Sequence, residues 1–352
     1  GTGRYWGRNP ITGRIDGTVT DPSAVGVVVD DLDLGGVFML DTSPLDPGVY
    51  AAAHASLSNT RMIGVSSITA EMRNLSFDLN AGLSLGLNVV DFSRSTHGVV
   101  DSAGTITQQP GYAIGGPQNA SPVVLAYDRA LLRMQGMADF KVLDVAMMEG
   151  RFDVQVDSQG LVFYVDGTGR LGPANGFRIE VTQFQAFLLV KAGGVAAKAT
   201  LAVEPIVIGS AVSLTTDALT LAINTTGKDV SYTIPEAIRR AGKPDTIIVS
   251  SIPPGGMKAA GYAAASGSGC LKLLDAVTMN GGFDILLKSD VSTFTFDMTL
   301  AMPVINPLAV TGALHYVTGD GGGLFGSLQA GAANGASIID VPGFSLNAAM
   351  LL

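Results

Sequence analysis

The stretch FDVQVDSQGLVFYVD (152–166) decides the fold class, because apolar and polar residues alternate in it on either side of a polar turn. Alternation with a period of two places successive side chains on opposite faces of an extended strand. The stretch therefore predicts two β-strands joined by a turn.

Runs of the same kind recur along the chain. They are rich in Val, Ile, Phe, Tyr and Thr, and Gly, Asn, Asp, Ser or Pro bound them, as is typical of strands. The clearest are GRIDGTV (13–19), RNLSFDLN (73–80), FRIEVTQFQAFLLV (177–190), DALTLAIN (217–224), DILLKSDVSTFTFDMTL (284–300) and GFSLNAAMLL (343–352). The sequence therefore predicts an all-β chain.

Helix signals are few. TIPEAIRRAG (233–242) has Thr233 at a capping position, Pro235 in the first turn and Gly242 at the end, which predicts a helix of two turns at most. AYDRALLRMQG (126–136) has helical propensity, but its apolar residues also fit a strand, which we favour. We expect at most one or two short helices.

The composition excludes several kinds of protein. Only 14% of the 352 residues are charged, against roughly 25% in typical soluble domains, and the chain holds 45 glycines. The net charge is −9 and no basic stripe with interleaved aromatic residues is present, which argues against nucleic acid as a partner. A single cysteine, Cys270, excludes a disulfide framework within the chain and a cysteine-based zinc cluster.

We expect neither a signal peptide at the start of the sequence nor a membrane-spanning segment within it. GTGRYWGRNP (1–10) lacks the basic and apolar regions of a signal peptide. The most apolar stretch, 186–209, is interrupted by Lys191, Lys198 and Glu204, so we expect no transmembrane helix. The sequence reads as a part of something longer.

The chain repeats itself. FKVLDVAMMEGRFDV (140–154) aligns without a gap on LKLLDAVTMNGGFDI (271–285), with seven of 15 positions identical. AHASL (53–57) with RNLSFDLN similarly aligns on AKATL (197–201) with DALTLAIN, so that Asn80 falls on Asn224. A third element recurs as LGGVFML (34–40), FQAFLLV (184–190) and LNAAMLL (346–352).

These alignments predict tandem modules. Self-similarity at a fixed period is the signature of arrays whose units bury surface against their neighbours. We expect a leading linker over 1–11, a first β-repeat module over 12–176, a second over 177–330, and the start of a third over 331–352. Such elongated modules could be solenoid-like, or each could be a stacked β-sandwich.

Two short features carry a resemblance to known proteins. The INTTG run within LTLAINTTGKDVSYTIPEAI (219–238), and the hairpin entries MEGRFDV (148–154) and MNGGFDI (279–285), resemble the tandem β-rich repeats of giant surface or secreted proteins of bacteria. The resemblance implies roles in adhesion, matrix, filament or cell coat. It supplies no catalytic residue.

Most motifs that could carry chemistry have simpler interpretations. DGTGRLG (166–172) and GGGLFG (321–326) match a dinucleotide-binding pattern, but neither opens a helix, so we interpret both as glycine-rich turns. His54, His97 and His315 are too far apart in sequence to indicate a metal site. Tyr5 and Trp6 could stack on sugars, although a packing role is simpler.

Acidic residues give the only candidate metal ligands. Asp30, Asp31 and Asp33 in VVDDLDL could help to bind Ca²⁺, which takes carboxylate and carbonyl oxygens. The alternative is that these aspartates, like Asp320, belong to strand ends and turns. The acids repeated in both copies, Asp144 with Asp275 and Asp153 with Asp284, are interpreted as turn caps or as hydrogen-bonding groups between modules. No other cofactor is expected.

The sequence favours a structural or adhesive segment of a large extracellular repetitive protein or filament, without catalysis. Its partners would be neighbouring repeats, other copies or surface glycans, at the cell surface or outside the cell. Two alternatives stay open: a lipid-binding β-groove, and a carbohydrate-active enzyme on a β-solenoid, which would need two or three acids at one level.

Overall fold

The structure is a computed structural model of the 352-residue chain. It describes residues 5–8, 15–19, 26–43, 47–63, 65, 67–84, 88–100, 104–115, 122–143, 145–158, 160–173, 178–208, 212–253, 261–273, 276–288, 291–302, 305–317, 323–332, 339–341, 344–346 and 349–351. The chain divides into two compact units, residues 1–163 and 164–352, and each is described by itself.

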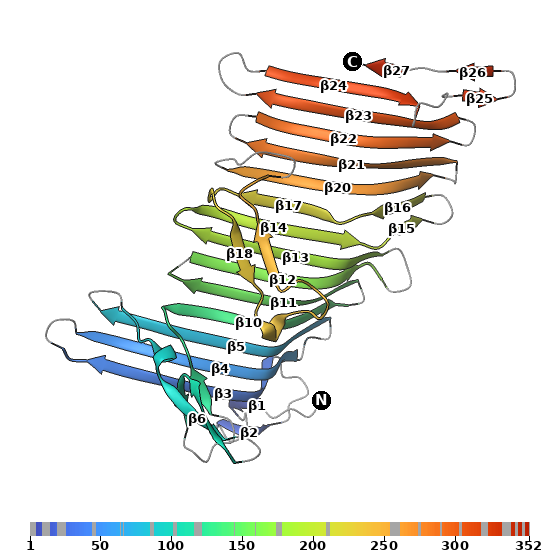
Figure 1. Ribbon diagram of the computed structural model, residues 1–352. Helices are drawn as coiled ribbons and strands as arrows, with labels where there is room; N and C mark the ends of the chain where they lie inside the picture. Colours follow the sequence, from blue (N-terminus) through green and yellow to red (C-terminus); the bar gives the residue numbers. More distant parts are fainter. Residues whose placement is uncertain are drawn as a thin grey trace. The chain divides into compact units, whose positions relative to one another are not determined.

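The first unit is built on an antiparallel sheet in the order β3-β4-β5-β10-β11 (Figure 1). These strands are β3 (Gly26–Asp41), β4 (Gly48–Ile63), β5 (Ile68–Ser84), β10 (Leu131–Val142) and β11 (Ala146–Asp157). A separate hairpin is formed by β1 (Tyr5–Arg8) and β2 (Ile15–Val19). The next strand, β12 (Gly160–Leu171), begins in this unit and continues in the second.

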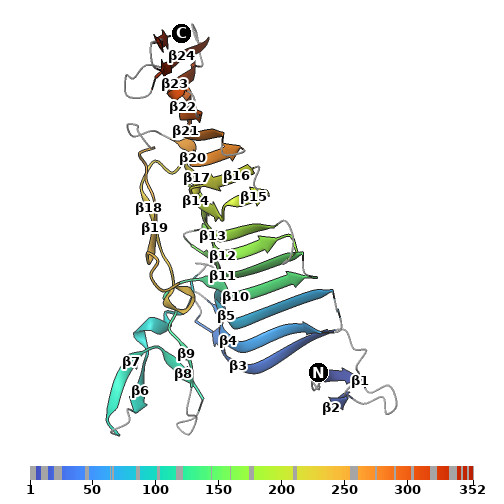
Figure 2. The same ribbon diagram turned by 90° about the vertical axis from the view of Figure 1, so that its right-hand side faces the viewer.

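The segment between β5 and β10 forms an insert that lies on one face of this sheet (Figure 2). It contains η1 (Phe92–Arg94), β6 (Thr96–Val100), β7 (Ile106–Pro110), β8 (Tyr112–Ile114) and β9 (Val123–Leu125). Phe92 and Leu125 of the insert are buried against Ala52 of β4, with Val37 and Met39 of β3 packed around them. We call the face of each unit's sheet that carries an insert its insert face, and the opposite face its open face.

The second unit has a longer antiparallel sheet, in the order β13-β14-β17-β20-β21-β22-β23-β24-β27. Its strands are β13 (Ile179–Lys191), β14 (Gly194–Val203), β17 (Leu219–Asn224), β20 (Tyr262–Leu273), β21 (Val277–Lys288), β22 (Val291–Met302), β23 (Ile305–Val317), β24 (Gly323–Ala332) and β27 (Ala349–Leu351). Two small hairpins accompany them: β15 (Ile206–Ile208) with β16 (Val212–Thr216), and β25 (Ile339–Val341) with β26 (Phe344–Leu346).

The second unit also has an insert, between β17 and β20. It contains β18 (Val230–Thr233), η2 (Glu236–Ile238) and β19 (Thr246–Val249). Tyr232 of β18 stacks on Phe187 of β13, with ring centroids 5.0 Å apart, and lies 5.5 Å from the ring of Tyr164. Phe187 and Tyr164 are buried, so these rings fix the insert to its sheet.

The all-β prediction is confirmed, although antiparallel pairing does not decide between solenoid-like and sandwich-like modules. The strand expected within 126–136 is present from Leu131. The helix expected over 233–242 is wrong in extent, because only Glu236–Ile238 form a short 3₁₀ turn. Thr233 cannot cap it, since that residue ends β18 and pairs with Thr246. Among the described residues, no helix is both long and apolar enough to cross a membrane.

The sequence repeat corresponds to a repeat of structure. The aligned stretches 140–154 and 271–285 form the β10–β11 hairpin and the β20–β21 hairpin. Their registers are equivalent, because Gln135 pairs with Asp153 in the first as Ser266 pairs with Asp284 in the second. Asn224 is the last residue of β17, and its counterpart Asn80 lies four residues before the end of β5 at Ser84. The exact module boundaries at 11, 176 and 330 stay predictions.

Candidate functional site

The open face of the first unit is apolar and exposed. The pairing registers place alternate residues of its strands on this face, and a positive φ of 51° at Asp31 shifts the alternation of β3 by one residue. Val27 and Val29 therefore share the face with Leu32 and Leu34. Its exposed large apolar side chains are Val27, Val29, Leu32, Leu34, Phe38, Leu40, Met72, Phe77, Leu83, Leu132, Met134, Phe140, Met148 and Val156.

The open face of the second unit has the same character. On β17 and on β20 to β24, every described side chain that points to this face is uncharged. The exposed large ones on these strands are Leu219, Leu221, Leu273, Met279, Leu287, Met298, Leu314, Tyr316 and Leu324. Soluble monomers rarely expose contiguous apolar patches beyond a few hundred Å². This face is therefore the principal candidate site.

A hollow of about 700 Å³ lies within this face of the second unit. The side chains that line it include Leu219, Met279, Phe283, Phe294, Phe296 and Met298. Glycines leave room for the rings: a Cβ at Gly267 would overlap Leu219, and one at Gly312 would overlap Phe296. Leu219 and Phe296 therefore lie directly over sheet glycines and form part of the apolar wall of the hollow.

The insert face of the second unit is polar where the insert does not cover it. Asp284, Asp297 and Thr311 line a hollow of about 430 Å³, and Asp284, Lys288 and His315 line one of about 440 Å³. His315 Nδ1 lies 3.2 Å from the Thr293 hydroxyl. The sheet of β20 to β24 is therefore amphipathic, with charge confined to one face.

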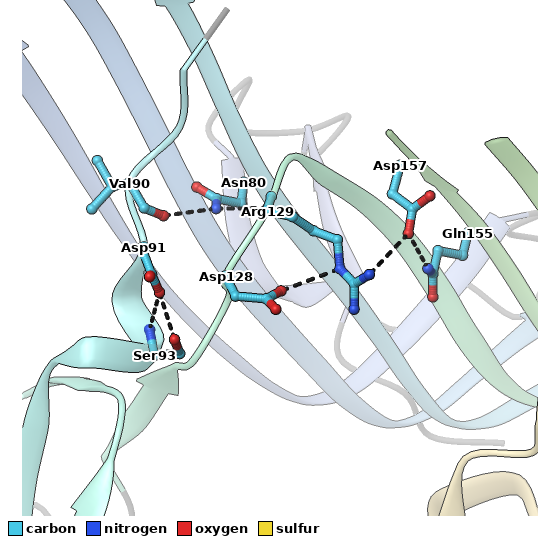
Figure 3. Close-up of polar contacts among 8 residues, drawn as sticks. All are labelled: Asn80, Val90, Asp91, Ser93, Asp128, Arg129, Gln155 and Asp157. Atoms are coloured by element: carbon cyan, nitrogen blue, oxygen red, sulfur yellow. Dashed lines mark hydrogen bonds and ion pairs between the residues drawn. The ribbon is translucent and has the colours of Figure 1, made fainter. Parts of the chain in front are cut away.

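A buried asparagine fixes the insert in the first unit (Figure 3). The Asn80 amide nitrogen donates to the carbonyl of Val90 at 3.0 Å and to that of Arg129 at 2.8 Å, at the beginning and the end of the insert. Only 2% of Asn80 is exposed. One side chain in the last part of β5 thus holds both ends of the insert.

Charged contacts support this attachment in the first unit. Arg129 lies 3.2 Å from Asp128 and 4.0 Å from Asp157 of β11, and Gln155 donates to the same Asp157 carboxylate at 2.6 Å (Figure 3). The Asp157 side chain is nearly buried. Buried carboxylates need such partners, because desolvation of an unpaired charge is costly.

The second unit repeats the asparagine attachment. The amide nitrogen of Asn224 approaches the carbonyls of Lys228, Val249 and Ser250 at 2.9, 3.2 and 3.0 Å. Its oxygen accepts from the backbone N–H of Thr226 at 2.9 Å. The sequence alignment placed Asn80 on Asn224 without giving either a role. Their equivalent positions in aligned strand segments were the available signal.

His54 and Asp78 face each other on the insert face of the first unit. His54 Nδ1 lies 2.6 Å from an Asp78 carboxylate oxygen, and the Tyr127 hydroxyl donates to the same oxygen at 2.7 Å. Burial alone would raise the pKa of Asp78, but the hydrogen bonds of His54 and Tyr127 outweigh it and lower that pKa below its usual value. Burial and the Asp78 carboxylate raise the pKa of Tyr127.

This geometry predicts an acid-dependent part of the stability. A carboxyl whose folded pKa is depressed stabilises the fold above its unfolded pKa, here 3.8, and loses that contribution as the pH falls through the folded value. Asp78→Asn should therefore destabilise the first unit at neutral pH, and the difference from the unsubstituted protein should shrink below pH 3.8. Urea unfolding midpoints at a series of pH values measure this. A difference that is constant with pH would contradict the account.

The repeated acids occupy different environments in the two units. Asp153 is fully buried, and Arg133 donates to its carboxylate from Nε at 2.8 Å and from Nη2 at 3.3 Å. Its counterpart Asp284 is exposed and has no ion pair among the described residues. Both lie within strands, so the expectation that they cap turns is wrong. Asp144, Asp275 and Asp320 lie outside the described residues.

The candidate calcium ligands lie along β3. Asp30 is paired with Arg61 at 2.9 Å, and Asp31 accepts a hydrogen bond from the Ser58 hydroxyl at 3.0 Å. Asp33 is exposed and lies opposite Ser56. Within the described part of the chain, no group of three acidic, histidine or cysteine residues is arranged to hold a metal ion. Calcium binding by these three aspartates stays a prediction.

The remaining motifs are dispersed. His97 Nδ1 donates to the Gly111 carbonyl oxygen, 3.2 Å away in the insert. Gly167 and Gly169 of the first glycine pattern lie inside β12, and residues 323–326 of the second lie in β24, so neither forms the expected turn there. Side chains of Tyr5 and Trp6 lie outside the described part.

No known protein-family model matches the chain, and no curated protein matches it.

Proposed function

We propose that this chain is a structural, non-catalytic segment that assembles by packing the open face of its sheets against another open face. The observation that carries the proposal is the uncharged apolar face of β20 to β24. Sheets pack face to face about 10 Å apart with interdigitating side chains. A second copy of the chain supplies a surface of the same chemistry.

The size of this face suits a stable interface. Strands β20 to β24 have 10 to 13 residues each. At ~4.8 Å between strands and ~3.3 Å per residue, their footprint is about 950 Å². Two such faces would bury on the order of 1,900 Å², within the roughly 1,200–2,000 Å² of specific protein interfaces.

The distribution of charged residues also supports assembly through the open faces. Asp284, Asp297, Lys288 and His315 all lie on the insert face, which can therefore stay in water. Neither the open face of β20 to β24 nor its apolar hollow presents a cation to an anionic headgroup. The extracellular, adhesive or filament setting implied by the resemblance to bacterial surface repeats is part of this proposal, with neighbouring repeats and other copies as partners.

A matched pair of substitutions on β23 tests the proposal. Leu314 lies on the open face and Thr311 on the insert face, and both are exposed. Leu314→Lys should weaken association by about 100-fold or more, because it would bury an unpaired charge. Thr311→Lys should leave association unchanged. Sedimentation velocity over a range of concentrations measures both, and equal behaviour of the two variants would refute face-to-face packing.

A second candidate function is lipid binding, which the apolar hollow of about 700 Å³ favours. Ligand sites typically enclose ~300–1,000 Å³ with mostly apolar walls. In that case the purified protein would be monomeric at all concentrations and would release lipid on organic extraction. Leu314→Lys would then reduce the extracted lipid rather than the oligomer.

A further inference from the structure

The outer edge of β3 is long and weakly protected. Across Gly26–Asp41 the strand pairs with β4, and no strand of the described part of the first unit lies on its other side. Natural edge strands are usually blunted by lysines, prolines or charges that disfavour pairing. Residues 34–40 of β3 contain none of these.

Strands equivalent to β3 lie beside the last strand of a preceding module. The element LGGVFML in β3 recurs as FQAFLLV in β13, which neighbours β12 in the strand order. It recurs again at residues 346–352, where β27 lies beside β24. That last pairing is short: Gln329, Ala330 and Gly331 of β24 pair with Leu351, Met350 and Ala349.

The alignment of these elements gives a register for β3. Placing residues 34–40 on 346–352 puts Phe38 in the position of Met350, so Phe38 would lie opposite Ala330. Leu40 would then lie opposite Leu328. Phe38 and Leu40 point to the open face of their sheet, and Ala330 and Leu328 point to the open face of theirs. The alignment did not use face direction, so this agreement is independent support.

We propose that β3 of one copy pairs antiparallel with β24 of a second copy and displaces β27, which pairs there through only three residues, so that Phe38 lies opposite Ala330. The contact joins two different surfaces, so each copy would still offer to the next its β3 edge, or its β24 edge once β27 has left it. Such heterologous contacts build open chains unless a rotation closes them. The proposal concerns strand edges and is independent of the face-to-face packing proposed above.

Disulfide trapping between two differently tagged full-length chains tests the register. Both chains carry Cys270→Ser. One carries Phe38→Cys, and the other carries either Ala330→Cys or, as the control, Leu324→Cys on the same face of β24. Directly opposite residues have Cβ atoms ~4.5–5.5 Å apart, within reach of a disulfide after slight adjustment, whereas six residues along a strand span ~20 Å. We expect the mixed disulfide with Ala330→Cys to form at least tenfold faster than with the control.

Three outcomes would overturn the edge pairing. The first is equal trapping at positions 330 and 324, and the second is no trapping at either. The third is a link that forms inside a chain carrying both Phe38→Cys and Ala330→Cys but never between mixed chains. Adding Leu314→Lys to both partners separates the two proposals, because it should abolish face-to-face association while the trapping rate persists. A trapping rate that falls with Leu314→Lys would show that the faces, and not the edges, bring the chains together.

Discussion

Replacing Asp153 by alanine should lower the free energy of unfolding of the first unit by about 3–5 kcal/mol, the usual cost of breaking a buried ion pair by removing one partner. The Asp153 side chain is 1% exposed and that of Arg133 is 22% exposed. Two hydrogen bonds join them across the β10–β11 hairpin. Without the carboxylate, the guanidinium loses the two charge-assisted bonds that offset its burial.

The repeat supplies the control for this experiment. Asp284 occupies the equivalent register position in β21 but is exposed, and Asp284→Ala should change stability by no more than about 0.5 kcal/mol. Urea denaturation followed by circular dichroism, with the two units fitted as separate transitions if they separate, measures both variants. Equal effects of the two substitutions would show that burial and Arg133 do not set the contribution of Asp153.

Asn224→Leu should destabilise the second unit by about 1–3 kcal/mol, because it removes the side-chain donor of the Val249 carbonyl and one of two donors from the Lys228 and Ser250 carbonyls. The Asn224 amide serves the carbonyls of Lys228, Val249 and Ser250. The insert should open before the sheet does. Hydrogen exchange should therefore accelerate at the amides of β18 and β19 more than at those of β21 and β22.

Two controls delimit this result. Asn280→Leu alters an exposed asparagine on β21 and should leave exchange of the insert unchanged. Asn80→Leu should accelerate exchange in the first insert in the same way, through the two carbonyls that Asn80 serves, and should leave the second insert unchanged. Uniform acceleration across the whole second sheet after Asn224→Leu would mean that the asparagine stabilises the sheet itself and not the attachment of the insert.

Much of the fold was predictable because it rests on local alternation. The period of two in FDVQVDSQGLVFYVD places Phe152 and Val154 on one face of β11, and the pairing with β10 keeps that assignment. The repeat of 140–154 in 271–285 predicted equivalent hairpins, and their registers are indeed equivalent. Both patterns predict the structure correctly because a slip of one residue in strand pairing would move the apolar side chains to the opposite face of the sheet.

The site was less predictable because it depends on residues distant in sequence. The difference between Asp153 and Asp284 lies in the neighbouring strand, where Arg133 occupies the position that Ala264 takes in the second unit. The aligned stretches 140–154 and 271–285 do not include these two positions, and nothing in either strand alone marks the difference. The attachment of the inserts by Asn80 and Asn224 could not be predicted, because alternation within a strand does not indicate where the chain returns after the insert. The short 3₁₀ turn at 236–238 reflects the pairing of Thr233 in β18, which overrides its capping propensity.

The asparagine attachments have a consequence for how such proteins can vary. Asn80 and Asn224 bind main-chain carbonyls of the insert, so these bonds place no demand on which side chains the insert carries. The two inserts indeed differ in their elements, with four strands in one and two in the other among the described residues. A foreign loop could therefore replace either insert, provided that it places main-chain carbonyls where the asparagine can bind them. The sheet would keep its own sequence.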